Sequence, residues 1–594
     1  MDRKGIIAIS LALITLVAWF FYTNNENRKA VAAYAKEQAA AEAAKAEAAK
    51  TEPSPEKPAT TGVAAATTPA PAVEATPSQP EVPEKQEQLS TETVEYTFTN
   101  LGGGLARTLL KNHEAERGTK MVLNEFGEIP IASISEAAGE GTKAPFTSTV
   151  DTANGTITFD RTDAKKLQMT KRFTVPKSTD LKSDYIVDLD VTFTNRGEQP
   201  LTIPAYFVHT GSTAPVHQDD RADYTGFKWY GGKLITAPSF EGGMWSKGRS
   251  VFAEAHSNIE WAGVANQYFT TLVTPVLEDA GKPTQRGQQG AAVWAKRFEI
   301  LNHQWTESGR TIKSDAKIYG VNGALGMPAF TLEPGKSLVQ KFQIYAGPRE
   351  YGRLRLLAND ESDIMDFGTF GFVSKTLLNT MNWLHGKLGS YAAAIIVLTL
   401  IIKCLLWPMQ NKATQSMKRM QLLTPKQTEI REKYKDDPTR MNAEVMKLYK
   451  DYGVNPMSGC LPMLVQIPIF FGFYNMLGKA VELRNSHFLW VHDLSQPDTI
   501  WHLPMLGYPL NVLPLLMAGT MLLQMSLSPK SGDAMQQRMF MFMPLIFVGF
   551  CYNYASALAL YWTVQNLFSV VQLYVTRNQA PPTLQKVTAP PKRK

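Results

Sequence analysis

The segment from Ser390 to Met409 constrains the fold most, because it is apolar over a membrane-crossing length and yet contains a charge. Its sequence is SYAAAIIVLTLIIKCLLWPM, and about 20 mainly apolar residues cross a bilayer as one helix. Lys403 lies inside it, where insertion of a lysine costs roughly 2.5 to 3.5 kcal/mol. We therefore expect Lys403 to face protein or a water-filled cavity, with Thr399 on the same helix face. The alternative is that Lys403 snorkels to the cytoplasmic membrane surface.

Four further apolar segments follow, and we predict membrane spans at 459–478, 504–527, 538–554 and 557–576, in addition to 390–409. These later spans contain amides, among them Gln466, Gln524 and Gln565. An amide that faces hydrocarbon lacks a hydrogen-bond partner, so one cation and several amides indicate a hydrated cavity between the helices. A bundle interior joined by interhelical hydrogen bonds is the alternative.

The N-terminal segment 1–22 is a sixth predicted span, because Ile6 to Tyr22 contains no charged residue. We interpret it as an uncleaved anchor, with Arg3 and Lys4 holding the N-terminus in the cytoplasm. A signal peptide cleaved near Ala33-Tyr34-Ala35 is the alternative. Residues 23–92 are rich in Ala, Glu, Pro and Thr, so we predict a low-complexity linker there.

Residues 93–355 contain many short runs of β-branched and aromatic residues separated by turn signals, a pattern typical of a β-sandwich. All three cysteines lie in predicted spans, so this region has no disulfide. Its histidines and acids show no metal-ligand or catalytic-triad spacing, including His209, His217, His256 and Glu260. We predict no metal, no cofactor and no catalytic residue.

Two helical regions outside the spans are predicted. In 364–388 apolar residues recur at intervals of three and four, which indicates an amphipathic helix on the outer membrane surface, or alternatively one packed on the sandwich. Residues 410–456 are polar and basic, and we expect a cytoplasmic helical hairpin with Asp437 as a cap and Pro438 first in its second helix. The basic tail 577–594 also favours the cytoplasm, so six spans place both termini inside.

Five stretches resemble one known family and occur in its order: IIVLTLIIKCLLWPM, YKDYGVNPMSGCLPMLVQIPIFFGFYNML, VELRNSHFLWVHDLS, MQQRMFMFMP and ALALYWTVQNLFSVVQ. They resemble the YidC/Oxa/Alb family of membrane protein insertases over about residues 364 to 577. NQYFTTLVTP and LEPGKSLVQKFQIYAGP are similar to the periplasmic domain of Gram-negative members. The resemblance implies a multi-domain membrane protein: a five-span insertase core, an N-terminal anchor and a periplasmic all-β supersandwich similar to sugar-mutarotase folds.

The resemblance also implies a function and a site. It implies a non-enzymatic insertase and chaperone of the bacterial inner membrane, with a hydrophilic groove for incoming chains. Its implied partners are nascent membrane proteins, the Sec translocon, the lipid bilayer, and the ribosome through the hairpin and basic tail. By position, Lys403 matches the family's groove arginine, Thr399 a polar groove residue, and Trp562 a position that is commonly tyrosine. Lysine keeps the charge but loses the planar fork of arginine.

Two other function classes are compatible with the residues alone. A transporter or channel would use the same polar spans to move a solute, although two matching broken-helix halves are absent from the sequence. A membrane-tethered carbohydrate enzyme would place its activity in the β-rich region.

Overall fold

The computed structural model describes most of the chain from residue 83 to residue 577. The described ranges are 83–115, 119–140, 143–177, 180–217, 220–238, 240, 242–243, 246–276, 289–300, 305–307, 310–312, 318–455, 461–502, 509–528 and 534–577. The predicted N-terminal anchor and the basic tail after residue 577 lie outside these residues. The predicted linker ends too late, because strand β1 (Gln86–Ser90) pairs with β2 (Val94–Thr99).

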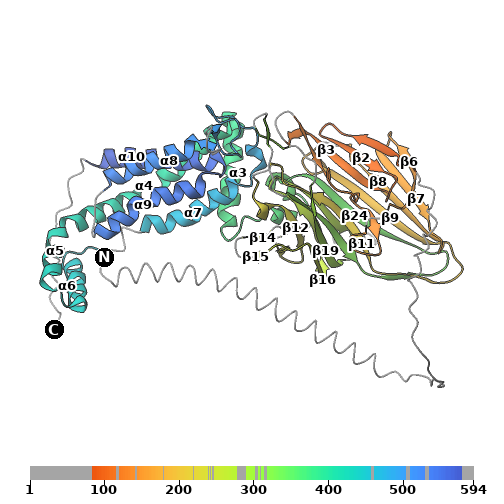
Figure 1. Cartoon of the computed structure of the whole chain (residues 1–594), viewed down its shortest axis with the longest axis horizontal. Coiled ribbons are helices and arrows are strands. Elements are labelled where there is room, and N and C mark those ends of the chain that lie inside the picture. The colour runs from red at the N-terminus through yellow and green to blue at the C-terminus, as the bar shows by residue number, and fades with distance from the viewer. Residues whose placement is uncertain are drawn as a thin grey trace, which may run out of the picture.

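A β-rich part and a helical part lie next to each other along the longest axis of the molecule (Figure 1). The β-rich part extends from β1 to β24 (Ser337–Pro348), and the helical part from α2 (Tyr351–Leu354) to α10 (Ser556–Arg577). Helices α5 (Thr424–Lys433) and α6 (Pro438–Asp451) lie at the end far from the sheets. Helix α3 (Gly371–Leu388) lies at the opposite end of the helical part, next to the sheets.

Three antiparallel sheets form the β-rich part. A nine-stranded sheet has the order β13 (Leu234–Thr236), β12 (Gly226–Tyr230), β17 (Trp261–Ala265), β18 (Phe269–Val276), β24, β9 (Ile186–Asn195), β8 (Leu167–Thr174), β7 (Thr156–Thr162) and β6 (Thr147–Asp151). A five-stranded sheet has the order β16 (Val251–Ile259), β19 (Gly290–Glu299), β22 (Tyr319–Met327), β11 (Tyr206–Thr213) and β5 (Ile134–Ser135). The four-stranded sheet consists of β1, β2, β3 (Gly104–Glu114) and β4 (Lys120–Leu123).

Four two-stranded sheets complete the strand pairing within the described residues. They are β10 (Leu201–Ile203) with β23 (Phe330–Leu332), β14 (Gly242–Gly243) with β15 (Ser246–Lys247), β20 (Trp305–Glu307) with β21 (Arg310–Ile312), and β25 (Thr499–His502) with β26 (Pro509–Asn511). The last pair lies in the helical part of the chain, where no strand was predicted.

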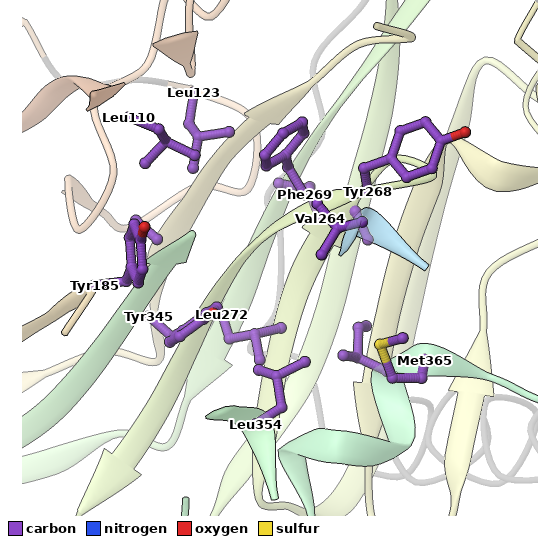
Figure 2. Packing of buried hydrophobic residues seen from close by; sticks show 14 of the residues in the cluster. Leu110, Leu123, Tyr185, Val264, Tyr268, Phe269, Leu272, Tyr345, Leu354 and Met365 are labelled. Carbon is purple, nitrogen blue, oxygen red and sulfur yellow. The ribbon is translucent and has the colours of Figure 1, made fainter. Parts of the chain in front are cut away.

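One hydrophobic core joins the sheets to the segment that leads into the helices. Strand β11 contacts β17 and β18 across the two larger sheets, so their apolar faces are buried against each other. Figure 2 shows Leu272 of β18 beside Leu354, and Phe269 and Met365 belong to the same buried cluster; Leu354 and Met365 follow β24 in sequence. Leu354 and Met365 are fully buried. The core therefore fixes where the chain leaves the β-rich part.

His209, His217 and His256 of the β-rich part have separate partners and do not form one site. His209 Nε2 lies 2.8 Å from Ser135 Oγ, and His217 Nδ1 lies 3.2 Å from Asp220 Oδ1. His256 Nε2 lies 3.0 Å from Glu254 Oε1. Among the described residues, no group of three or more potential ligands could hold a metal ion.

Helix α4 (Tyr391–Leu422) extends well beyond the predicted span, which ends at residue 409. Its start is defined by Gly389, which ends α3 in the left-handed region at φ 69°, and by Ser390, whose Oγ accepts from Ala393 N at 3.4 Å. Pro408 lies inside the helix and does not end it. The first part of the predicted hairpin is therefore a continuation of the span.

The apolar helices α7 (Leu461–Leu477), α9 (Ala534–Cys551) and α10 overlap the predicted spans, but α8 (Val512–Leu527) begins eight residues later than its predicted start. The reason is local pairing. Asn511 is fully buried and donates from Nδ2 to Tyr552 O at 2.6 Å, while its Oδ1 accepts from Thr499 Oγ1 at 2.6 Å. These bonds hold residues 509–511 as a strand.

Among the described residues, α4 alone is both long and apolar enough to cross a membrane by length and composition. Residues Leu464–Leu477 and Val512–Leu527 form shorter apolar helices. The six-span arrangement remains a prediction.

Helix α3 buries Leu377, Leu378 and Met381 and packs against α4 and α7. Phe372 and Trp383 on this helix are 83% and 62% exposed. The helix is thus amphipathic, as predicted, and its buried face contacts other helices.

In α6 the predicted cap is confirmed, since Asp437 Oδ1 accepts from Arg440 N at 3.0 Å and Pro438 is the first helical residue. A small core of Leu423, Tyr449 and Val454 packs with four partly buried residues: Met420, Val445, Leu448 and Tyr452. The apolar side chains of Met417, Ile430, Tyr434 and Met441 do not join this core.

Candidate functional site

Lys403 is buried between α4 and α10, with 7% of its surface exposed. Its Nζ donates to Ser569 Oγ at 3.0 Å, and Ser569 Oγ in turn donates to Gln565 O at 2.9 Å, one turn earlier on α10. Within the described part of the chain, Lys403 forms no ion pair. The interior of the helical part thus contains a cation whose described partner is a neutral hydroxyl.

Thr399 is also buried, at 1% exposure, but its hydroxyl has a different role. Its Oγ1 donates to Ile395 O at 2.7 Å, within α4. Thr399 therefore adds a polar group near Lys403 without a hydrogen bond to it.

A second polar contact joins α7 to α10. Gln466 Nε2 donates to Tyr561 OH at 2.9 Å and to Gln565 Oε1 at 3.2 Å. Gln565 also accepts the Ser569 hydroxyl through its backbone carbonyl. The structure thus brings three predicted residues, Lys403, Gln466 and Gln565, into one hydrogen-bonded chain through Ser569.

Trp562 lies in an aromatic cluster next to this polar chain. Its ring centroid lies 4.9 Å from that of Phe470 and 4.6 Å from that of Phe547. Beside it, Phe473 stacks on Tyr561 at 4.0 Å. We call Phe470, Phe473, Phe547, Tyr561 and Trp562 the aromatic layer.

Gln524 lies apart from these groups, near the end of α8. No hydrogen bond of its side chain is found within the described residues, and its backbone oxygen accepts from Ser528. The polar link from α8 to α10 is instead Asn566, whose Nδ2 donates to Thr520 Oγ1 at 3.1 Å.

Ser569 and Tyr561 also belong to the site and are not among the predicted residues. A signal for Ser569 exists, because it lies between Gln565 and Gln572, which share a helix face. Tyr561 gives no such signal, since a tyrosine in an apolar helix is ordinary packing.

A second group of charges lies where the helical part meets the β-rich part, outside the apolar helices. Lys228 Nζ forms an ion pair with Asp366 Oδ2 at 3.0 Å, and Lys479 Nζ donates to Asp366 O. Burial lowers the pKa of Lys479 to about 8, and the nearby Asp366 opposes that shift. For Asp366, burial raises the pKa, but Lys228 and Lys479 outweigh burial and hold this pKa below its usual value.

Two family models match the chain. The model described as the YidC periplasmic domain matches residues 86–380, and the model of the 60Kd inner membrane protein matches residues 383–583. Together they cover both parts of the structure and the candidate site.

Curated relatives show the same similarity. The membrane protein insertase YidC of Pelobacter propionicus is 30% identical over 550 residues, which are 88% of this chain and 94% of that protein. YidC of Syntrophobacter fumaroxidans is 44% identical over 255 residues, which are 42% of this chain and 46% of that protein.

Among solved structures, an active YidC insertase with its first transmembrane domain resolved is 18% identical and matches 83% of this chain and 93% of that one, with a TM-score of 0.34. A galactose mutarotase-like protein from Lactobacillus casei is 10% identical and matches 44% of this chain and all of that one, with a TM-score of 0.25. From the family models and the full-length relative, the chain belongs to the YidC family of membrane protein insertases.

Proposed function

We propose that this insertase receives the translocated tail of an incoming membrane protein in a polar groove around Lys403. The insertase activity, its non-enzymatic nature, the nascent membrane protein substrates, the inner-membrane location and the periplasmic domain follow from family membership. That membership decides against the transporter and carbohydrate-enzyme alternatives. The groove itself is our proposal. Its proposed lining residues are Lys403, Thr399, Gln466, Gln565 and Trp562, together with Gln524 near the end of α8.

The buried contact of Lys403 with Ser569 is the observation that supports the groove best. Burying a charge is costly unless it is paired, and the described partner of this cation is a neutral hydroxyl 3.0 Å away. A carboxylate from a substrate would stabilise the ammonium more strongly than a hydroxyl does, because it adds the attraction of an opposite charge to the hydrogen bond. Lys403 therefore favours substrates with acidic tails.

The aromatic layer gives the groove a direction. Helix α10 begins at Ser556, whose N–H donates to Gln496 O in a loop that contacts Tyr268 of the periplasmic domain, so Tyr561 and Trp562 lie closer to that domain than Ser569 does. The hydrated space around Lys403 would thus open toward the cytoplasm and the lipid, and the aromatic layer would close it on the periplasmic side. The amides Gln466 and Gln565 lie between the two.

Short helices support release of the substrate into lipid. Helices α7 and α8 contain 17 and 16 residues, which gives each about 25 Å at 1.5 Å per residue. A bilayer core is about 30 Å thick, so the lipid beside these helices would thin. Partitioning of the substrate's apolar segment into lipid supplies free energy for insertion. The membrane potential adds about 2.3 kcal/mol per translocated charge per 100 mV.

We also propose the remaining arrangement on the basis of the charge pattern. Six spans place both termini in the cytoplasm, and α5 and α6 form a cytoplasmic hairpin that, with the basic tail, contacts the ribosome. The family resemblance adds the five-span core, the supersandwich and cooperation with the Sec translocon.

A pair of substrates tests the groove. Insertion of one short-tailed membrane protein, with an acidic tail and with the same tail made neutral, is measured in proteoliposomes containing the full chain. We expect Lys403→Ala to slow the acidic substrate about tenfold, equivalent to about 1.4 kcal/mol, and to leave the neutral one unchanged. Lys403→Arg should retain most activity, because it keeps the charge.

Lys412→Ala is the matched control, since Lys412 lies on the same helix and is exposed. It should affect neither substrate. Equal slowing of both substrates by Lys403→Ala would show that the charge does not act on the tail.

A further inference from the structure

One short segment of the periplasmic domain, residues 221–224, contacts Tyr474 of α7, and we call it the cap. The 3-10 helix η1 (Ala222–Tyr224) forms most of it. Asp220 fixes its start, because its Oδ2 accepts from the backbone N–H groups of Val216 and His217 at 2.8 and 2.9 Å. The Asp220 side chain is 4% exposed. The cap is therefore held in a defined position.

Arg221 reaches from the cap to the helical part. Its Nε and Nη2 donate to the two carboxylate oxygens of Asp223 at 3.0 and 2.7 Å. This two-pronged pairing fixes the guanidinium plane, and the remaining nitrogen Nη1 donates to Tyr474 OH at 2.6 Å. Arg221 also lies over the Tyr224 ring at 5.2 Å.

Tyr474 belongs to a second set of stacked rings, next to the aromatic layer. Its ring stacks on Tyr554 at 4.5 Å and on Phe550 at 5.5 Å, and it lies 6.1 Å from Phe470 of the aromatic layer. Tyr554 OH donates to Tyr474 O at 2.9 Å, and Tyr224 of the cap lies near Tyr474 and Tyr554. A continuous set of rings therefore connects the cap to Trp562.

Tyr554 is fitted closely against the neighbouring backbone. A Cβ atom at Gly478 would lie 1.9 Å from Tyr554 OH, so only glycine allows this approach. Gly478 O in turn accepts from Gln267 Nε2 of the periplasmic domain at 2.7 Å. Tyr268 OH adds a bond to Ser495 O at 3.2 Å. These contacts hold the domain where the cap meets the rings.

We propose that the cap of the periplasmic domain seals the periplasmic end of the groove against water and ions. A hydrated groove that reaches Lys403 leaves only a few helical turns of protein between cytoplasmic water and the periplasm. Aromatic rings exclude water, but the hydroxyls of Tyr474 and Tyr554 would each attract it if they faced the periplasm. Arg221 supplies the Tyr474 hydroxyl with a protein partner instead, the Tyr554 hydroxyl bonds Tyr474 O, and Tyr224 lies beside both. The inference goes beyond insertion and gives the periplasmic domain a function as a barrier.

A native thiol can report on this seal. Cys551 is 1% exposed and follows Phe550, which stacks on Tyr474. In the full chain with Cys404→Ser and Cys460→Ser, a membrane-impermeant maleimide is added from the periplasmic side of spheroplasts. We expect Cys551 to label slowly, and the double change Arg221→Ala with Tyr224→Phe to raise the labelling rate at least tenfold.

The matched control is Arg249→Ala, an exposed arginine of the same domain, which should leave the rate unchanged. Labelling in denaturant measures total thiol, and thermal melting shows whether each variant is folded. If the double variant does not fold, Asp223→Asn decides, because it loosens the Arg221 fork and should give a smaller increase.

Two results would overturn the proposal. One is a folded cap variant that labels at the wild-type rate, and the other is a wild-type chain whose Cys551 already labels as fast as in denaturant. Because the thiol readout needs no substrate, it stays separate from the proposed action of Lys403. An insertion defect of Lys403→Ala without any change at Cys551 would support the groove and leave the seal to be judged by the cap variants alone.

Discussion

At the residue scale, Glu482 forms an unusual pair with Asn382 of α3. Glu482 lies in the 3-10 helix η4 (Val481–Leu483), and its Oε1 accepts from Asn382 Nδ2 at 3.1 Å. Glu482 Oε2 and Asn382 Oδ1 are both buried and without a hydrogen-bond partner among the described residues. A buried acceptor without a donor is costly, whereas a protonated Glu482 carboxyl would have a proton to donate.

Burial raises the pKa of Glu482 from 4.5 to about 7, and the charge of Glu350 adds to that increase. Tyr391 is the other titratable group that it faces. The folded protein thus holds a proton that the unfolded chain releases between pH 4.5 and 7. The contribution of Glu482 to the free energy of unfolding is therefore fully present below this range and is lost as the pH rises through it, by about 3 kcal/mol at most.

We predict that Glu482→Gln removes this pH dependence, because an amide pairs with Asn382 at every pH. Thermal unfolding of the purified chain at pH 5 and pH 8 measures the effect. The variant should melt at a higher temperature than the wild type at pH 8 and close to it at pH 5. Glu333→Gln, an exposed position, should follow the wild type. If the Glu482→Gln and wild-type curves stay parallel, Glu482 is not the group that titrates.

At the scale of elements, the start of α8 depends on Asp498, which lies outside the helix. Asp498 Oδ2 accepts from Leu513 N at 2.6 Å and from Trp490 Nε1 at 3.0 Å. The Asp498 carboxylate thus accepts from an N–H group in the first turn of α8, as the side chain of an N-cap residue usually does. The N-cap residue itself, Asn511, forms no side-chain capping hydrogen bond.

We predict that Asp498→Ala frays the first turn of α8, because it leaves the Leu513 amide without its acceptor. A lost cap costs typically about 1 kcal/mol, so hydrogen exchange at Leu513 should accelerate roughly five- to tenfold. Exchange in α10 should not change. Asp498→Asn retains one acceptor oxygen, so its exchange rate at Leu513 should lie between those of the wild type and Asp498→Ala. If Asp498→Ala exchanges at the wild-type rate, water replaces the carboxylate without a loss of stability.

At the scale of the whole molecule, Arg484 connects the two parts of the chain. It follows η4, and its Nη2 donates to the backbone oxygens of Glu114 and Ala115 at 2.6 and 2.8 Å. Its guanidinium also lies 4.8 Å from the Tyr268 ring centroid. One side chain from a loop between apolar helices thus holds a strand end of the periplasmic domain.

We predict that Arg484→Ala lets the periplasmic domain unfold separately, because hydrogen bonds from a charged donor contribute about 1.5 to 3 kcal/mol each. Calorimetry of the full chain should show two transitions, or a wider separation between them than in the wild type. Arg484→Lys should restore only part of the coupling, since lysine lacks the fork. Lys336→Ala is the control, because Lys336 is exposed and distant in sequence from Arg484. An unchanged thermogram for Arg484→Ala would show that Arg484 does not couple the two parts of the chain.

The features that the sequence predicts well depend on neighbours along the chain. Asp437 as a cap and the extent of α10 follow from capping residues and helical periodicity, which act over one or two turns. The burial of Lys403 follows from the cost of a charge in an apolar segment. Each of these needs no knowledge of a distant partner.

The features that the sequence does not predict depend on distant partners. Residues 509–511 look apolar enough for a span, but their pairing with 499–502 and the Tyr552 bonds hold them as a strand. Ser569 gains its role only because α4 places Lys403 beside it. Strand β1 looks like linker until β2 supplies its hydrogen-bond partners.

The unbroken length of α4 has a mechanical consequence. Its 32 residues make a rod of about 48 Å at 1.5 Å per residue, and Lys403 lies some 28 Å from its far end at Leu422. Pro408, which lacks an N–H, is the natural point of bending, and a bend of about 10° there would act over about 21 Å and shift that end by roughly 4 Å relative to Lys403. The helix is therefore a lever, by which a load on the α5 and α6 end is transmitted to the buried cation.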